Sequence, residues 1–135
     1  MAAQRDLANQ LLELARDDEA AARTLLEADS VESVVGFHCQ QAVEKALKAV
    51  LADGALQFPF THDIELLVQL CADAGAPLPD DLADVDQLTP FAARVRYGTA
   101  PVPDVDLGSC LDWAAQTILW ARERLGETPS PSDPS

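Results

Sequence analysis

Residues 32–52 read ESVVGFHCQQAVEKALKAVLA, and this stretch decides the fold. At roughly 100° per residue, its small and branched apolar side chains fall on one face of a helix. These residues are Val35, Cys39, Ala42, Val43, Ala46 and Val50. The pair Asp29-Ser30 can cap such a helix at its start, and Asp53-Gly54 can end it, because glycine readily takes the left-handed conformation. We therefore predict a helix over residues 32–52 with one side packed in a core.

A polar row follows another side of the same predicted helix. It spans an arc of roughly 80° and includes both lysines of the chain. Its members are His38, Gln41, Lys45 and Lys48. One interpretation is a solvated helix face on which Glu44 pairs with Lys48 one turn later. The other is a groove for a phosphate group or a nucleotide, because lysine binds phosphate as a point charge and histidine can donate a hydrogen bond.

Helical patterns continue on both sides of this stretch. Residues 2–28 carry apolar side chains at a spacing of three to four, which predicts a first helix. The apolar positions are Leu7, Leu11, Leu14, Ala21 and Leu25. A short third helix is expected over residues 63–74, with Thr61 as its cap, and the run Gly75–Pro79 should end it.

The second half of the chain predicts two more helices and a tail. A fourth helix begins at Asp80 and must kink or restart at Pro90, because proline lacks the backbone donor. The last helix starts after Asp104 or Asp106 and ends near residue 125, and residues 126–135 (GETPSPSDPS) are expected to be disordered. The prediction is an all-α, up-and-down bundle of four to five helices over residues 1–125.

The composition narrows the class of protein. A chain of 135 residues suffices for one domain, and a formal net charge of −14 disfavours generic binding to DNA or to anionic membranes. Cys39, Cys71 and Cys110 form no CxxC pair, so we expect free thiols in the core rather than metal ligands. A charged, amphipathic N-terminus and the lack of a long apolar run predict a cytoplasmic protein without signal peptide or membrane span. The sequence has no metal-site pattern and no glycine-rich phosphate loop, so we expect no cofactor.

Two further sets of residues are candidates for the site. Arg94, Arg96 and Tyr97 close the fourth predicted helix and add positive charge, although cations are favoured near any helix C-terminus. His62 is either a first-turn residue bonded to nearby backbone or a site residue that packing brings beside His38.

Two tryptophans of the last helix are candidates for an interface. Trp113 and Trp120 lie seven residues apart beside an apolar stripe of that helix. They either widen its core face or anchor a helix–helix dimer interface, where enclosed tryptophans often dominate the binding energy.

Three motifs, taken in order, resemble the HEPN domain family. They are FHCQQAVEKALKAVL at 37–51, THDIELL at 61–67 and RVRYG at 94–98. The H-x-Q-Q-x-x-E-K-x-x-K string is the most specific of them, and the order of helices extends the resemblance over about residues 2–125. The residues that match polar positions of the family are His38, Gln41, Glu44, Lys45, Lys48, His62, Arg96 and Tyr97.

The resemblance implies a bundle that is usually a homodimer and is often paired with a minimal nucleotidyltransferase in a two-component, toxin–antitoxin-like system. Members are proposed to bind nucleotides, and many are metal-independent ribonucleases. Their R-x4-6-H motif is missing here, because YGTAPVPDVD follows Arg96 and both histidines lie upstream. We therefore expect a nucleotide-binding and interaction component rather than an enzyme. The alternatives are a ribonuclease with a displaced site at His38 or His62 with Arg94, and a purely structural dimerisation module.

Overall fold

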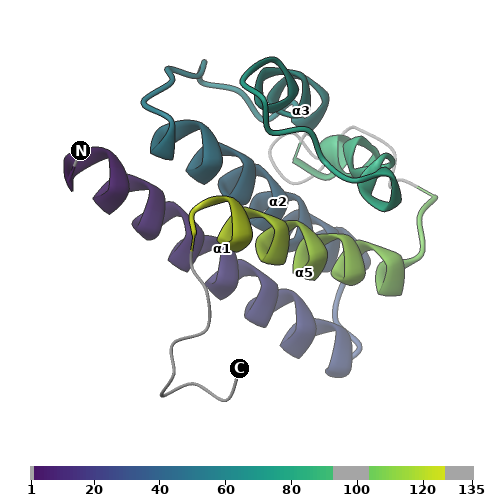
Figure 1. Ribbon diagram of the computed structural model, residues 1–135. Coiled ribbons are helices and arrows are strands. Elements are labelled where there is room, and N and C mark those ends of the chain that lie inside the picture. Colours follow the sequence, from purple (N-terminus) through teal and green to yellow (C-terminus); the bar gives the residue numbers. More distant parts are fainter. Residues whose placement is uncertain (1, 93–103, 127–135) are drawn as a thin grey trace.

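The computed structural model describes residues 2–92 and 104–126, and these are helices, turns and loops without a strand. Helix α1 (Ala2–Glu27) and helix α2 (Glu32–Asp53) form a hairpin, and α5 (Leu107–Arg124) packs against both of them (Figure 1). Helix α3 (Ile64–Asp73) lies against α2. The all-α bundle predicted from the sequence is confirmed, whereas the expected tail at 127–135 lies outside the described residues.

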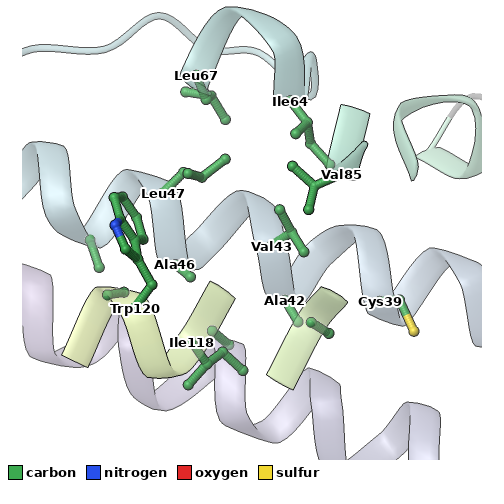
Figure 2. Close-up of a cluster of buried hydrophobic side chains, with 14 of the residues drawn as sticks. Cys39, Ala42, Val43, Ala46, Leu47, Ile64, Leu67, Val85, Ile118 and Trp120 are labelled. Atoms are coloured by element: carbon green, nitrogen blue, oxygen red, sulfur yellow. The ribbon is translucent and has the colours of Figure 1, made fainter. Parts of the chain in front are cut away.

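Helix α2 is the central helix of the bundle. It contacts α1, α3 and α5, so its buried surface is wider than the single predicted face. Figure 2 shows Val43 and Leu47 of α2 turned toward Ile64 and Leu67 of α3, with Ile118 of α5 on the other side. Burial extends to two polar residues, Gln40 and Glu44, which are not members of the predicted polar row.

The region after α3 differs from the predicted fourth helix. Two 3₁₀ turns, Asp80–Leu82 and Val85–Leu88, replace a continuous α-helix from Asp80. Their apolar residues Leu82, Val85 and Leu88 recur every third position, which a helix of three residues per turn brings onto one buried side. The restart at Pro90 is confirmed, since residues 89–92 are α-helical and proline is well accommodated in a first turn.

The apolar stripe predicted for α1 is buried only in part, because Leu11 and Leu25 pack against the core but are not its innermost residues. The fully buried residues of α1 are Ala8, Leu12, Ala15 and Ala22. The small alanine side chains allow the backbones of α1 and α2 to approach closely, and their spacing of seven keeps them on one side of the helix. Leu7 and Leu14, expected in the core, are instead 45% and 47% exposed.

The bounds predicted for α2 are confirmed, but its ends are capped in a different way. The residue before α2 is Val31, which has no capping side chain, so Asp29-Ser30 is not its cap. Gly54 has a φ of −82°, and Ala55 takes the left-handed conformation in its place with a φ of 61°. These ends are held by backbone hydrogen bonds of the turns, which a residue-type rule does not anticipate.

The N-terminal caps of α3 and α5 are aspartates. Asp63, rather than the predicted Thr61, caps α3 by accepting from the amide of Leu66. Asp106 caps α5 by accepting from the amide of Ser109 at 2.9 Å, which confirms one of the two predicted caps.

The ends of the bundle are tied together by Arg5 and by a close helix contact. The Arg5 guanidinium donates to the carbonyl of Leu125 and lies 3.0 Å from a carboxylate oxygen of Asp53, so it joins α1 to the ends of α5 and α2. At the other end, the ring of Phe91 lies directly on Gly36, where an added Cβ would overlap the ring. Phe91 itself is fully buried.

The three cysteines are free and fully buried, as expected. Burial raises the pKa of Cys39 and of Cys71 to about 12 and that of Cys110 to about 11. A thiolate is the nucleophilic and metal-binding form of cysteine, so these side chains serve the core as small apolar groups.

Candidate functional site

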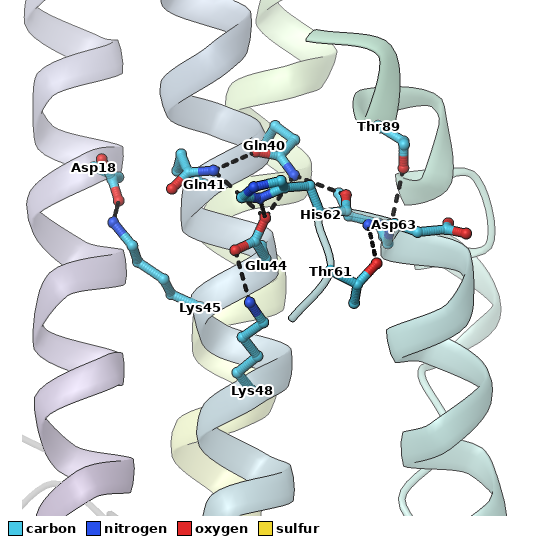
Figure 3. A network of polar contacts seen from close by, with 11 residues as sticks. Asp18, Gln40, Gln41, Glu44, Lys45, Lys48, Thr61, His62, Asp63 and Thr89 are labelled. Atoms are coloured by element: carbon cyan, nitrogen blue, oxygen red, sulfur yellow. Dashed lines mark hydrogen bonds and ion pairs between the residues drawn. The ribbon is translucent and has the colours of Figure 1, made fainter. Parts of the chain in front are cut away.

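The first part of the site is a buried carboxylate on α2, that of Glu44 (Figure 3). Its side chain is only 6% exposed. One oxygen accepts from Gln40 Nε2 at 3.0 Å and lies 2.8 Å from His62 Nδ1. The other oxygen accepts from Lys48 Nζ at 3.0 Å. We call these four residues, Gln40, Glu44, Lys48 and His62, the Glu44 cluster.

The hydrogen bonds of the Glu44 cluster keep its carboxylate charged. Burial on its own raises the pKa of Glu44, because a charged group loses water on entering the protein. Hydrogen bonds from Gln40, His62 and Lys48, together with the positive charge of Lys48, outweigh burial, and the pKa of Glu44 lies below its ordinary value of 4.5. The result is a buried anion at neutral pH, held by donors from α2 and from the loop before α3.

The second part of the site centres on Asp18 of α1. One oxygen of Asp18 accepts from Lys45 Nζ at 2.6 Å, and the other lies 3.0 Å from His38 Nδ1. The Asp18 side chain is 12% exposed, against 25% for Lys45 and 28% for His38. We call these three residues the Asp18 cluster, and it links α1 to the same helix that carries the Glu44 cluster.

The polar row predicted from the sequence is therefore divided between two carboxylates. Lys45 and His38 turn toward Asp18, whereas Lys48 turns toward Glu44. Gln41 joins the second group by donating to Gln40 Oε1 at 2.7 Å. The pairing of Glu44 with Lys48 was predicted as part of a solvated face. The pair exists, but it is buried, with its side chains 6% and 13% exposed.

His62 contacts Glu44 rather than His38, the site residue that was predicted to lie beside it. The sequence analysis expected either a backbone-bonded first-turn residue or a partner of His38. His62 combines two roles. Its imidazole contacts Glu44, as a site residue would, and its carbonyl anchors the loop by accepting from Gln40 Nε2 at 3.1 Å. Each histidine thus contacts a different carboxylate.

Both histidines present the same ring atom to a carboxylate. Because an ionised carboxylate only accepts hydrogen bonds, Nδ1 must carry the hydrogen in His62 and in His38. This fixes the tautomer and leaves Nε2, on the opposite side of each ring, as the atom that can accept or, once protonated, donate. The arrangement is that of a carboxylate that orients an imidazole.

The loop before α3 brings an aromatic ring to the Glu44 cluster. Lys48 Nζ lies 5.8 Å from the centre of the Phe58 ring, within the range of a cation–π contact. Thr61 Oγ1 accepts from the amide of Asp63 at 3.0 Å, and Thr89 Oγ1 accepts from the amide of Ile64 at 3.1 Å. The loop that carries His62 is therefore fastened to α2 and to residues 89–92.

Of the remaining predicted residues, the structure describes only the two tryptophans. Arg94, Arg96 and Tyr97 lie outside the described residues. Trp120 is buried in the core at 8% exposure, and its Nε1 has no hydrogen-bond partner within the part of the chain that the structure describes. Trp113 is partly buried and packs against the same core. Both placements fit the wider core face, and the dimer interface stays a prediction.

Two residues that organise the site, Asp18 and Gln40, were not singled out from the sequence. Glu44 was named as a partner of Lys48 and as a match to the family, but not as a buried carboxylate. The sequence does contain a pattern that could have found Asp18. In an antiparallel hairpin that turns near residues 29–30, Asp18 of α1 faces the part of α2 that lies between His38 and Lys45. No comparable signal shows that Glu44 is buried, since this depends on α3 and its loop.

The described residues hold neither a metal-binding group nor a membrane span. Across residues 2–92 and 104–126, no three His, Cys, Asp or Glu side chains gather as metal ligands. None of the helices in these ranges combines the length and the hydropathy needed to cross a bilayer.

The fold and site define an all-helical bundle with a polar, histidine-containing cluster along its central helix. The chain belongs to the HEPN family, because the family model described as HEPN domain matches residues 8–124. The match covers α2, the loop with His62 and all of α5. No curated protein and no solved structure gives a significant match.

Proposed function

We propose that this HEPN domain binds a nucleotide through the Glu44 cluster and acts with a minimal nucleotidyltransferase in a two-component, toxin–antitoxin-like pair. The observation that carries the proposal is the buried, charged Glu44 with Lys48 and His62 held against it. Buried ion pairs give little stability compared with apolar residues of similar size. Their presence at the junction of α2 and the loop before α3 is better explained by a ligand than by packing.

The cluster can bind a phosphate group with donors that Glu44 leaves available. An ammonium group has three hydrogens, and only one of those on Lys48 is directed to Glu44. His62 can donate through Nε2 while Nδ1 still donates to Glu44, and the ring then carries a positive charge.

The Asp18 cluster supplies a second, similar pair of donors. Lys45 and His38 are held by Asp18 in the way that Lys48 and His62 are held by Glu44. The two lysines and the two carboxylates cancel in charge, so neither cluster is a simple basic patch. Recognition of an anion would rest on placed hydrogen-bond donors, which suits a defined nucleotide better than a long phosphate backbone.

The partner and the quaternary structure belong to the same proposal. The family resemblance supports a homodimer and a neighbouring nucleotidyltransferase, and the cytoplasm as the location. Affinity purification of the tagged chain from its own cells should recover a nucleotidyltransferase in a fixed ratio, identified by mass spectrometry. Recovery of the chain without any transferase would contradict this part of the proposal.

A second candidate function is metal-independent RNA cleavage, and the oriented imidazoles favour it. In such a reaction a base takes the proton of a ribose 2′-hydroxyl, the 2′-oxygen attacks phosphorus, and the bond to the 5′-oxygen breaks as an acid protonates it. His38 and His62 are each held through Nδ1, so each presents Nε2 for one of these proton transfers. The products would be a 2′,3′-cyclic phosphate and a free 5′-hydroxyl.

One experiment tests both functions. The chain is mixed with AMP, GMP, CMP, UMP, ATP or a short structured RNA in the presence of EDTA, and thermal stability and RNA cleavage are recorded. We expect at least one nucleotide to raise the melting temperature, and Lys45→Met/Lys48→Met to remove that increase. Arg23→Met is the matched control, because Arg23 is also a paired cation, 2.7 Å from Glu19, but lies outside both clusters.

The outcomes separate the candidates. A nucleotide effect that survives Lys45→Met/Lys48→Met would contradict binding at the clusters. RNA cleavage that disappears in His38→Ala or His62→Ala would establish the second candidate. If no nucleotide stabilises the chain and no RNA is cleaved, the remaining candidate is a structural dimerisation module, in which the clusters only join helices.

A further inference from the structure

Phe60 is the most exposed large apolar side chain of the described residues. Its relative exposure is 109%, whereas the other large apolar residues at the surface range from 39% to 64%. A whole aromatic ring therefore projects into solvent from the loop between α2 and α3. Scattered leucines at a surface are ordinary, but a fully projecting phenylalanine calls for an explanation.

The exposure of Phe60 is imposed by the chain on both sides of it. Two residues earlier, Phe58 packs against the core and lies 5.8 Å from Lys48 Nζ. Two residues later, His62 is fixed by Glu44 through its ring and by Gln40 through its carbonyl. The Leu56 amide also donates to the carbonyl of Leu51 at 3.0 Å. Phe60 thus projects from a segment that is anchored before and after it.

The same anchors keep Phe60 close along the chain to the donors of the Glu44 cluster. Two chain steps separate Phe60 from His62, which limits their Cα atoms to about 7 Å apart. Lys48 contacts the residue two steps on the other side, Phe58. A flat apolar surface, an imidazole and an ammonium group therefore lie within one short stretch of surface.

We propose that Phe60 is the base-stacking residue of a nucleotide site, with the phosphate of the same nucleotide held by Lys48 and His62. The inference rests on the proposed nucleotide binding and adds what the site would recognise, an aromatic base. Stacking on an exposed aromatic ring is a common means of base recognition and tolerates any base, because every base has a flat π face.

A nucleobase fits this surface better than a protein partner does. Protein hot spots place an aromatic anchor inside a wider apolar area that excludes water. Here the residues next to Phe60 in the chain are the exposed Pro59 and the half-buried polar Thr61, and His62 follows. One isolated ring with adjacent phosphate donors matches the two ends of a nucleotide.

The test compares ligands that differ only by the base. Isothermal titration calorimetry of the full chain at pH 6.5 with AMP, GMP, CMP, UMP and ribose 5-phosphate measures how much the base adds to affinity. We expect the wild-type chain to bind at least one monophosphate more tightly than ribose 5-phosphate, by roughly 5- to 100-fold. Phe60→Ala and Phe60→Leu should abolish this preference, and Phe60→Trp should retain it.

Matched controls make the result specific to the ring. Val31→Ala shortens another exposed apolar side chain, 64% exposed, and should leave the preference unchanged. Because Phe60 makes no buried contact, Phe60→Ala should unfold at the wild-type temperature.

Three outcomes would overturn the inference, and they can be told apart. A base preference that persists in Phe60→Ala would refute stacking while nucleotide binding still stands. Retention of the preference in Phe60→Leu, with loss in Phe60→Ala, would show apolar contact rather than stacking. Failure of the wild-type chain to bind any of the five ligands would refute the proposed function itself.

Discussion

Lys48 Nζ lies 3.0 Å from Glu44 Oε2, one helical turn apart on α2, with both side chains nearly enclosed. Pairs at this spacing on an exposed helix contribute a few tenths of a kcal/mol. Here the pair is buried beneath the loop that carries His62, so removing one partner leaves a charge without water. Substitution of Lys48 or Glu44 should therefore affect stability more than substitution in an exposed pair would.

The first prediction concerns the difference in burial between the ion pairs of Lys48 and Lys45. Lys48→Met should lower the free energy of unfolding by about 3 kcal/mol, because Glu44 would remain buried without its cation, bonded to Gln40, Gln41 and His62. Lys45→Met should cost about 1 kcal/mol, because the Lys45–Asp18 pair is more exposed. Urea titration followed by circular dichroism measures both, and equal losses would contradict the burial difference.

The second prediction concerns acid. The pKa of Glu44 is lowered in the folded chain, so its contribution to stability is complete above the ordinary value of 4.5 and is lost as the pH falls through the folded-state value. The difference in unfolding free energy between the wild-type chain and Glu44→Gln should therefore be constant from pH 7 to 5. It should shrink at lower pH, and a difference that grew on acidification would contradict the charge state assigned to Glu44.

The third prediction concerns the thiols. Because burial raises the pKa of all three cysteines to between about 11 and about 12, the folded chain should not react with a disulfide reagent at pH 8. Full labelling of Cys39, Cys71 and Cys110 should appear only in denaturant. Mass spectrometry counts the labels, and a rapid single label in the native chain would show that one thiol is accessible.

The fourth prediction separates the two tryptophans. Trp120→Phe should change the unfolding free energy by no more than about 1 kcal/mol, because the lost indole N–H has no partner in the described chain. Trp113→Ala should shift a dimer toward monomer in sedimentation velocity, since Trp113 is the less buried of the two. A wild-type monomer at all concentrations would contradict the expected homodimer.

The fold was predictable to a large extent because it depends on local patterns. The apolar face of α2 and the stops at Gly75 and Gly126, both with positive φ, follow from residue type and spacing. The face of α1 was predicted only in part, since leucines carry the stronger apolar signal although alanines are the more deeply buried residues. Which side is buried is decided by the partner helix, and a pattern within one helix does not contain that information.

The site was predictable in membership but not in arrangement. His38, Lys45, Lys48 and His62 were singled out from their residue types and positions, and each contacts a carboxylate in the structure. Asp18 stayed hidden among the 23 acidic residues of the chain, and Glu44 was named only as a partner of Lys48 and a match to the family, not as a buried group. Asp18 comes from another helix, and Glu44 becomes buried only when the loop before α3 folds onto α2.

The contact between Gly36 and Phe91 offers a way to adjust the abundance of the chain in cells. Gly36→Ala would place a methyl group inside the space of the Phe91 ring. The overlap should cost about 1–3 kcal/mol without removing any donor or acceptor. Such a variant would behave as a temperature-sensitive allele, folded in the cold and degraded when warm. Growth experiments could then separate the loss of this chain from the loss of its binding chemistry.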